Sequence, residues 1–321
     1  MKNIARNACA VALIWSATCP ARAQDYPTAP VRIISGFSAG SAADITARVI
    51  GARMGEILGQ QFVVEDRTGA ASSIAGAVVA RAPKDGYTLY VANAANIINA
   101  AMNPNLNFDV IKDFAPITLL TSTPTVLVVS PQLGVNSVDA LVALAQAKPD
   151  TISFGSSGAG SSTHLALELL KSLAHVKITH VPYAGSPQVI TDLLAGRIDG
   201  YFSPASSAME HVRAGKLVAL AVTDAKRSTF MPELPTMIEA GIPGFESVLW
   251  FGLVAPANTP QPIIDKLARA ANEALKSDEV AKTLRAQTVA PMGGTPEQFR
   301  LYMAAEHQRW NALVAGAGLR Q

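Results

Sequence analysis

One stretch, residues 31–48 (VRIISGFSAGSAADITAR), constrains the fold of this chain more than any other. Its first four residues are rich in β-branched side chains and follow two prolines, which predicts a short buried strand. Residues 36–41 then form a loop of small side chains, and from Ala42 the apolar positions recur at three- and four-residue spacing, which predicts a helix. Because the first amides of a helix have no partner within it, and the helix dipole favours negative charge there, this unit is typical of an anion site. No Lys or Arg lies between Gly36 and Ala47, so backbone amides and serine hydroxyls would do the binding.

Residues 1–23 have the three parts of a secretory signal. Lys2 and Arg6 form a basic start, residues 8–18 an apolar run, and residues 21–23 an A-x-A cleavage site. The apolar run is too short to cross a bilayer. We therefore predict a signal peptide at 1–23, cleaved near Ala23, and an exported mature protein; a lipoprotein signal at Cys19 is the lesser alternative.

Removing this segment changes what the composition implies. Both cysteines of the chain, Cys9 and Cys19, lie within it, so the mature protein is predicted to have no disulfide and no thiol chemistry. The 26 Lys and Arg fall to 23 against 24 Asp and Glu, and the formal net charge changes from +2 to −1. A nucleic-acid partner, which needs a basic surface, is therefore not expected. No later segment is long and uncharged enough to insert into a membrane.

Strands alternate with helices along the rest of the chain, which predicts an α/β protein with mostly parallel sheets. The asparagine-rich residues 93–113 are predicted to be an irregular loop. Strands are predicted at 31–34, 62–65, 87–91, 117–120, 126–129, 152–154, 178–181, 198–202, 217–222 and 249–255. Helices are predicted at 42–58, 74–81, 138–147, 164–173, 188–195, 206–213, 263–276, 280–286 and 296–315.

The order of these elements predicts two domains joined by two crossings of the chain, near 121–124 and 223–229. Residues 24–123 and 226–321 would form one domain, and residues 124–225 the other. Three small-residue loops, 36–41, 155–163 and 182–187, each follow a strand and precede a helix. Ligands of open α/β sheets bind beyond the carboxyl ends of the strands, so these loops predict a binding cleft between the domains.

Gly36-x-Ser38-x-Gly40 matches the G-x-S-x-G pattern that places a serine nucleophile between a strand and a helix. Here the pattern follows the first strand of the mature chain, whereas hydrolases of that fold have several strands before the serine. No histidine lies in a loop near the C-terminal end, because His307 falls in the predicted helix 296–315. An exported serine hydrolase is therefore the weaker alternative to a binding protein.

Other chemistry has less support in the sequence. The five histidines show no metal-binding spacing, no dinucleotide fingerprint is present, and no carboxylate pair suits acid–base catalysis, so no metal and no cofactor are predicted. Asp44 is interpreted as an acidic residue that complements the start of its helix, or as one that faces a ligand. His164 is interpreted as a hydrogen-bonding residue at a helix start, and His180 as structural.

Ten short segments, in this order, resemble the Bug family, the periplasmic solute receptors of tripartite tricarboxylate transporters. They are 37–48 (FSAGSAADITAR), 63–69 (VVEDRTG), 85–89 (DGYTL), 113–116 (DFAP), 155–165 (GSSGAGSSTHL), 180–185 (HVPYAG), 192–199 (DLLAGRID), 214–223 (AGKLVALAVT), 234–241 (LPTMIEAG) and 250–260 (WFGLVAPANTP). The resemblance implies a two-domain periplasmic-binding-protein fold, type II-like, which closes over a small organic acid. It also implies a membrane permease of the tripartite type as partner and no enzymatic activity; a receptor for a signalling partner is the alternative.

The resemblance also implies which residues contact the ligand. They are Phe37, Ser38, Ala39, Gly40, Ser41, Asp44, Ala70, Ala71, Ser72, Ser157, Gly158, Ser161, Thr163, His164, Tyr183, Ala184, Gly185 and Ser203. The chain departs from the family at Ser41, at Ala71-Ser72, where the family has glycines, and at Ala184 and Ser203, where it commonly has charged residues. This less charged pocket favours a mono- or dicarboxylate, with an apolar or aromatic body, over an amino acid.

Overall fold

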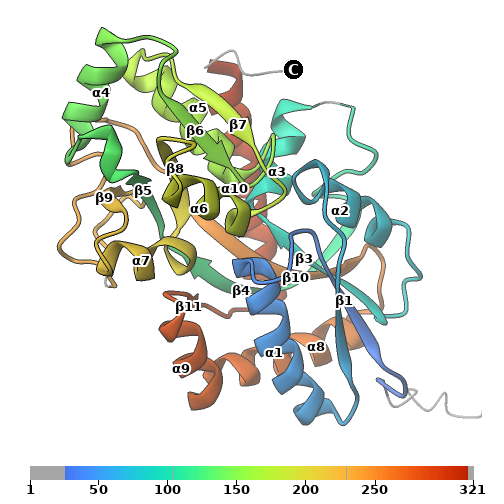
Figure 1. The fold of residues 1–321 in the computed structure, drawn as a ribbon. Helices are drawn as coiled ribbons and strands as arrows, with labels where there is room; N and C mark the ends of the chain where they lie inside the picture. The colour runs from blue at the N-terminus through green and yellow to red at the C-terminus, as the bar shows by residue number, and fades with distance from the viewer. Residues whose placement is uncertain (1–25, 104, 229, 317–321) are drawn as a thin grey trace, which may run out of the picture.

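The structure is a computed structural model that describes residues 26–103, 105–228 and 230–316. The predicted signal peptide at 1–23 lies outside these residues. Figure 1 shows two β-sheets with helices packed around each of them. Within the described part of the chain, no helix is long and apolar enough to cross a membrane.

The first sheet has six strands in the order β11-β4-β10-β3-β1-β2. Strands β1, β2 and β3 are parallel to one another, whereas β10 runs antiparallel to both β3 and β4. The strands are β1 (Val31–Ser35), β2 (Phe62–Asp66), β3 (Thr88–Asn93), β4 (Phe114–Thr123), β10 (Leu249–Pro256) and β11 (Ala290–Pro291).

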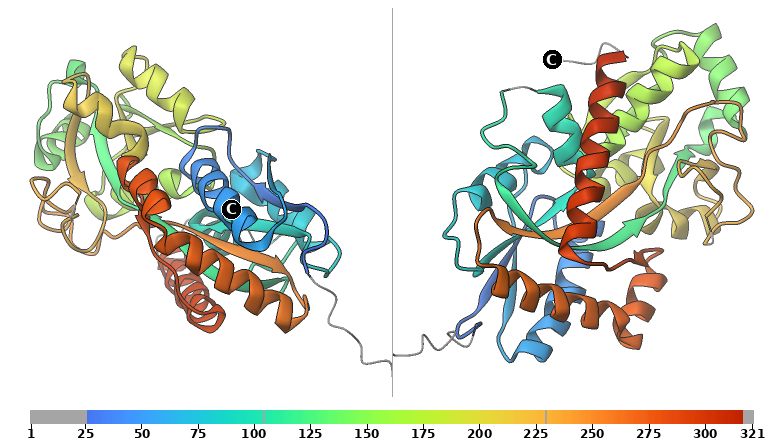
Figure 2. Two further views of the ribbon diagram at one scale, coloured as in Figure 1. Left: turned by 90° about the horizontal axis from the view of Figure 1, so that it is seen from below. Right: turned by 180° about the vertical axis from the view of Figure 1, so that it is seen from behind.

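Helices cover both faces of this sheet, and successive side chains of a strand point to opposite faces. Ile33 packs with one set of helices, α1 (Ala42–Leu58), α8 (Gln261–Lys276) and α9 (Asp278–Ala286). Its neighbour Ile34 packs with the other set, α2 (Ser73–Ala80), α3 (Ala94–Met102) and the long C-terminal α10 (Pro296–Gly316). Figure 2 shows α10 running behind the molecule from one sheet toward the other.

The second sheet has five strands in the order β7-β6-β8-β5-β9. They are β5 (Thr125–Val129), β6 (Ser153–Ser156), β7 (Thr179–Pro182), β8 (Gly200–Pro204) and β9 (Val218–Val222). Helices α4 (Val138–Ala147) and α5 (Ser162–Ala174) pack on one face, and α6 (Ser186–Leu194) and α7 (Ala205–Arg213) on the other. Two short 3₁₀ helices, η1 (Ala70–Ser72) and η2 (Pro131–Leu133), complete the fold.

The prediction of mostly parallel sheets is wrong for the strands next to the chain crossings. Strand β5 pairs antiparallel with β8 and β9, so both sheets are mixed. The chain passes between the sheets from β4 to β5 and from β9 to β10. Neither connection contains a helix that would cross over and bring the chain back parallel to a neighbouring strand.

The prediction of an irregular loop at 93–113 is also wrong, because its first part is helix α3. Asn93 caps the helix by accepting the Ala95 amide at 3.0 Å, and the Asn96 side chain accepts the Asn93 amide at 3.0 Å. Ile97, Ile98 and their apolar neighbours are buried against the first sheet. The asparagines that suggested a loop are therefore the residues that begin the helix.

The chain crosses between the sheets twice. The first crossing is Pro124, which lies between the end of β4 and the start of β5. After β9, Thr236 still pairs with Val222, and Met237 and Phe245 pack in the core of the second sheet. We propose that the second crossing lies near residue 248, where β10 begins, rather than at the predicted boundary of 225.

Candidate ligand-binding site

Loops from both sheets meet around a small cavity of about 20 Å³, which has room for about one water molecule. The first turns of α1, α5 and α6 all contribute to its wall, so three helix N-termini face it. The lining residues are Phe37, Ser41, Ala42, Ala43, Ser157, Ser162, Thr163, Ser186, Pro204, Leu249 and Phe251. No Lys, Arg, Asp or Glu is among them.

The two halves of the site touch at two places. A Cβ atom added to Gly185, just before α6, would lie 2.4 Å from Ser38 Oγ in the β1–α1 loop. A Cβ atom on Gly160, just before α5, would lie 3.4 Å from Asn99 Oδ1 and 3.8 Å from the Ala71 side chain. Residues 38 and 185, and residues 71 and 160, therefore bring the loops of the two sheets together.

The loops before α1 and α5 have the same local construction. Gly40 and Gly160 have φ of 77° and 75°, and the serine after each caps the helix. The Gly40 amide donates to Asp44 Oδ2 at 2.9 Å, and the Gly160 amide donates to His164 Nδ1 at 3.0 Å. The interpretation of His164 as a hydrogen-bonding residue at a helix start is confirmed.

Asp44 is held within its own loop rather than directed at the cavity. Besides accepting the Gly40 amide, its buried carboxylate lies 2.6 Å from Arg48 Nε. Arg48 also pairs with Asp66 at 3.2 Å on the outer side of α1. This arrangement supports the interpretation of Asp44 as an acid that complements the start of α1.

Hydroxyl groups line the second half of the cavity. Thr163 Oγ1 lies 3.1 Å from Ser157 Oγ and 3.0 Å from Ser161 Oγ, and it accepts the Ser157 amide at 2.9 Å. The Ser186 and Tyr201 hydroxyls are 2.8 Å apart. Burial raises the pKa of Tyr201 to about 12, so this phenol remains a neutral hydrogen-bonding group at any physiological pH.

The segment 70–72 has a strained backbone, with φ of 45° at Ala70, 50° at Ala71 and 75° at Ser72. Such angles are unfavourable for residues other than glycine, and they persist only where the surroundings fix them. Here the Ser72 hydroxyl lies 2.6 Å from the Tyr90 hydroxyl and accepts from Asn93 Nδ2 at 3.1 Å. The Ser72 side chain in turn fills the space beside Gly36.

Four of the predicted contact residues line the cavity: Phe37, Ser41, Ser157 and Thr163. Others support the loops through bonds of their own: Tyr183 donates its hydroxyl to Asp192 at 2.8 Å, and Ser203 donates to the Pro204 carbonyl at 3.0 Å. Ser38 and Gly185 meet across the site, whereas Ala39, Gly40, Ala70 and Ala184 are exposed at its edge and Gly158 is half-buried.

The sequence prediction missed seven lining residues, which lie next to the predicted loops or on a distant strand. They are Ala42, Ala43, Ser162, Ser186, Pro204, Leu249 and Phe251. Ser186 belongs to the 182–187 loop already noted in the sequence, and the first helical residues 42, 43 and 162 follow from the predicted helix starts. Leu249 and Phe251 carry no local signal.

The geometry gives the serine hydrolase no support. Ser38 Oγ is buried and has no hydrogen-bond partner among the described residues, so no histidine activates it. The two histidines near the site are engaged elsewhere: His164 with Gly160, and His180 with the Ser156 hydroxyl at 2.6 Å. Among the residues that the structure describes, no group of His, Cys, Asp and Glu is placed to hold a metal ion.

Comparison with known proteins fits this arrangement. The model of the family described as "Tripartite tricarboxylate transporter family receptor" matches residues 46–319. The chain belongs to this family. Protein BugT of Bordetella pertussis is 36% identical to this chain over 301 residues, which cover 93% of this chain and 92% of BugT.

Solved structures of similar proteins share the fold. The Rhodopseudomonas palustris protein Rpa4515, solved with adipate, superposes with a TM-score of 0.86 at 36% identity, covering 92% of this chain and 99% of that protein. MatC of the same organism, solved with bound malate, has a TM-score of 0.86 at 30% identity, covering 90% of this chain and 100% of MatC. The two-domain fold predicted from the sequence is confirmed.

Proposed function

We propose that this protein is a periplasmic receptor that binds a small organic carboxylate between its two domains and delivers it to a membrane permease of the tripartite tricarboxylate type. The observation that carries the proposal is the cavity that the N-termini of α1, α5 and α6 share, lined without a charged side chain. Free backbone amides and hydroxyls at helix N-termini favour an anion. Membership in the receptor family and the adipate and malate of similar proteins support the same ligand class.

The neutral lining narrows the ligand class. An amino acid would bring an ammonium group, which needs a carboxylate, and the nearby Asp44 is already paired with Arg48. A mono- or dicarboxylate needs only donors, which the amides and the Ser157, Thr163 and Ser186 hydroxyls supply. We propose a dicarboxylate as the first candidate. Because the cavity is smaller than any such acid, the loops on its two sides must move apart to admit the ligand.

A thermal-shift screen of the mature protein over mono-, di- and tricarboxylates, sugars and amino acids tests this proposal, because a ligand that binds only the folded state raises the melting temperature. We expect the largest shift from a carboxylate, and calorimetry should then give one site per chain. Binding of amino acids or sugars without binding of plain carboxylates would refute the proposed ligand class. Hydrolysis of an ester that is abolished by Ser38→Ala would refute the receptor role.

A further inference from the structure

His164 and Asp44 occupy equivalent places in the two copies of the same loop. The sequences are SAGSAAD over 38–44 and GAGSSTH over 158–164. In each, the capping serine amide donates to the carbonyl three residues earlier at 3.1 Å, and the serine hydroxyl accepts the amide of the last residue, at 3.3 Å for Asp44 and 3.2 Å for His164. The last side chain accepts the glycine amide in both. Asp44 and His164 therefore hold their loops in the same way.

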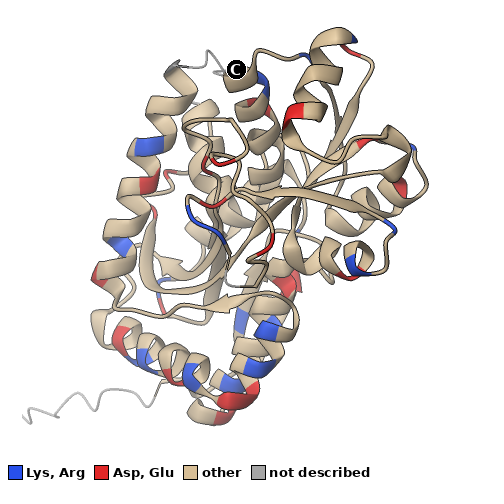
Figure 3. Cartoon of the chain, turned by 90° about the vertical axis from the view of Figure 1, so that its left-hand side faces the viewer, with Lys and Arg blue, Asp and Glu red and all other residues tan. Residues whose placement is uncertain are grey.

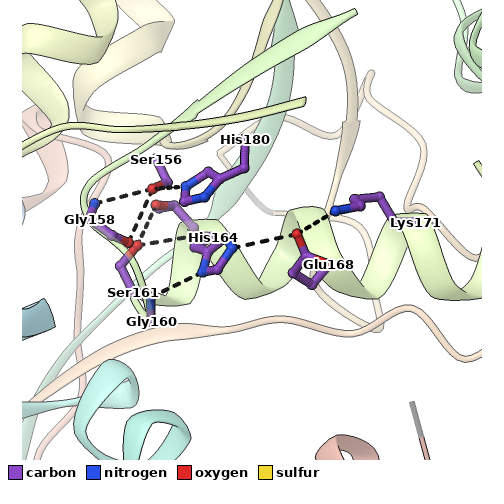
Figure 4. A network of polar contacts seen from close by, with 9 residues as sticks. Ser156, Gly158, Gly160, Ser161, His164, Glu168, Lys171 and His180 are labelled. Atoms are coloured by element: carbon purple, nitrogen blue, oxygen red, sulfur yellow. Dashed lines mark hydrogen bonds and ion pairs between the residues drawn. The ribbon is translucent and has the colours of Figure 1, made fainter. Parts of the chain in front are cut away.

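The two acceptors differ in what a proton does to them. Because the Gly160 amide is a donor, His164 Nδ1 accepts only while it carries no proton. The other ring nitrogen, Nε2, faces Glu168 Oε1 at 3.5 Å, which places the ring proton of neutral His164 on that side (Figure 4). A second proton on the ring would put two N–H groups face to face at the present Nδ1–Gly160 distance of 3.0 Å.

We propose, on the basis of the proposed carboxylate-binding function, that His164 is a positioning residue of the α5 loop and makes ligand affinity depend on pH. The neutral ring holds Gly160 in its left-handed conformation, so that the first amides of α5 face the cavity. Protonation of the ring breaks that hydrogen bond and releases the loop. Affinity for carboxylates then falls on acidification.

Titratable groups face His164 from its own helix and from the neighbouring strand β7. On α5, Glu168 faces the ring and Lys171 pairs with Glu168 at 2.7 Å. Burial raises the pKa of Glu168, but hydrogen bonds from His164 and Lys171 outweigh burial and lower that pKa, so Glu168 stays ionised. Among the described residues, α3 and β6 carry no titratable side chain, and β8 contributes only Tyr201.

His180 on β7 is the remaining neighbour, stacked on His164 with ring centroids 3.8 Å apart. Burial, with a smaller contribution from His164, lowers the pKa of His180 to about 4, so His180 stays neutral between pH 5 and pH 7.5. His180 contacts the Ser156 hydroxyl, which accepts the Gly158 amide at 3.2 Å. The stacked pair therefore supports both glycines of the loop.

A protonated His164 also brings positive charge toward an anionic ligand, so the two effects oppose each other. The ring does not line the cavity, and Glu168 lies beside it, which offsets the charge. The lost bond lies directly in the loop, and two buried donors without acceptors are costly. The loss of the hydrogen bond that positions the loop therefore outweighs the attraction between the protonated ring and the anionic ligand. We expect affinity for carboxylates to fall about tenfold between pH 7.5 and pH 5.

Calorimetry of the mature protein with adipate and with malate at pH 5, 6 and 7.5 tests this inference. His164→Asn keeps a neutral acceptor at the position that Asp44 occupies in the other loop, so its affinity should stay the same between pH 5 and pH 7.5. His164→Ala should bind more weakly at every pH. The matched control is His175→Asn, at the exposed C-terminal end of α5, which should keep the wild-type pH profile.

Two results would overturn the inference: a His164→Asn variant with the wild-type pH profile, or wild-type affinity that rises on acidification. Should neither acid bind at any pH, the carboxylate screen decides the proposed function separately. In that case the NMR signals of the unliganded protein test the loop itself. The Gly160 amide should shift as the His164 ring titrates in the wild type and not in His164→Asn, and equal shifts in both would contradict the inference.

Discussion

Closure of the site can be tested at one contact, between Gly185 and Ser38. Gly185 has φ of 175°, extended backbone that any residue adopts, so Gly185→Ala imposes no backbone strain. Its new Cβ atom would lie 2.4 Å from Ser38 Oγ, whereas ordinary contacts begin near 3.4 Å. The substitution therefore forces the two loops about 1 Å apart, or forces Ser38 into another rotamer. Either change alters the contact between Gly185 and Ser38, which joins the two halves of the site.

The cost of this overlap follows from known overpacking energies of about 1–3 kcal/mol. If the cost falls on the closed form, affinity weakens by about 5- to 150-fold, because 1.4 kcal/mol corresponds to a factor of ten. We expect a value near the middle, about thirtyfold, since among the described residues Ser38 Oγ has no hydrogen bond that would hold its rotamer. The melting temperature of the unliganded protein should change little, because the open form relieves the overlap.

Ser38→Ala provides the matched control, because it removes the overlapping atom. The nearest atoms to the new Cβ would then be Gln188 Oε1 at 3.5 Å and the Cβ atom of residue 38 at 3.6 Å, both ordinary contacts. In a double-mutant cycle measured by calorimetry, Gly185→Ala should weaken binding in the wild-type background and leave it unchanged in the Ser38→Ala background. Equal losses in both backgrounds would show that these loops do not meet in the ligand-bound protein.

Three further predictions concern stability. Gly36→Ala would place a Cβ atom 2.7 Å from the Ser72 Cα atom, so urea unfolding should show a loss of about 1–3 kcal/mol, and an unchanged midpoint would contradict the packing. Tyr90→Phe removes one of the two hydrogen-bond partners of the buried Ser72 hydroxyl, the other being Asn93, and should cost about 1–3 kcal/mol in the same assay. Burial raises the pKa of Asp224 from its ordinary value of 3.8 to about 6, so the folded protein binds more protons than the unfolded chain in that window, and stability falls as pH rises through it. Asp224→Asn should therefore raise the melting temperature at pH 7.5 and raise it less at pH 4.5; equal gains would contradict the shift.

Sequence alone could predict those parts of the fold and site that depend on local interactions. The strand–loop–helix unit at 31–48 is such a part, because the extended run, Gly40 and the capping Ser41 are all near neighbours. The same reasoning located the loop before α5, in which Gly160 and Ser161 have the same roles as Gly40 and Ser41. The absence of charged side chains from these loops already indicated a neutral site.

The remainder depends on contacts between distant segments. Leu249 and Phe251 lie in a strand whose residues are all buried, so only its pairing with β3 and β4 decides which side chains face the cavity. The second crossing is similar, because Met237 and Phe245 stay with the second sheet through packing and not through any boundary signal. Helix α3 is a further case. Its asparagines predict a loop from the sequence alone, because the sequence does not show that its apolar face packs against the first sheet.

Under the proposed function, the arrangement of helix ends couples ligand binding to closure of the domains. The first turns of α1, α5 and α6 share one cavity, and each helix N-terminus carries about half a positive charge. Bringing these ends together is unfavourable by itself, and a carboxylate between them turns the repulsion into attraction. Because α1 belongs to one sheet and α5 and α6 to the other, the anion interacts with all three only when the domains close (Figure 1). Charged side chains are frequent on outer surfaces such as α8 and α9 (Figure 3), and none lines the cavity. Opening therefore separates no ion pair among the lining residues, and the ligand can leave without that desolvation cost.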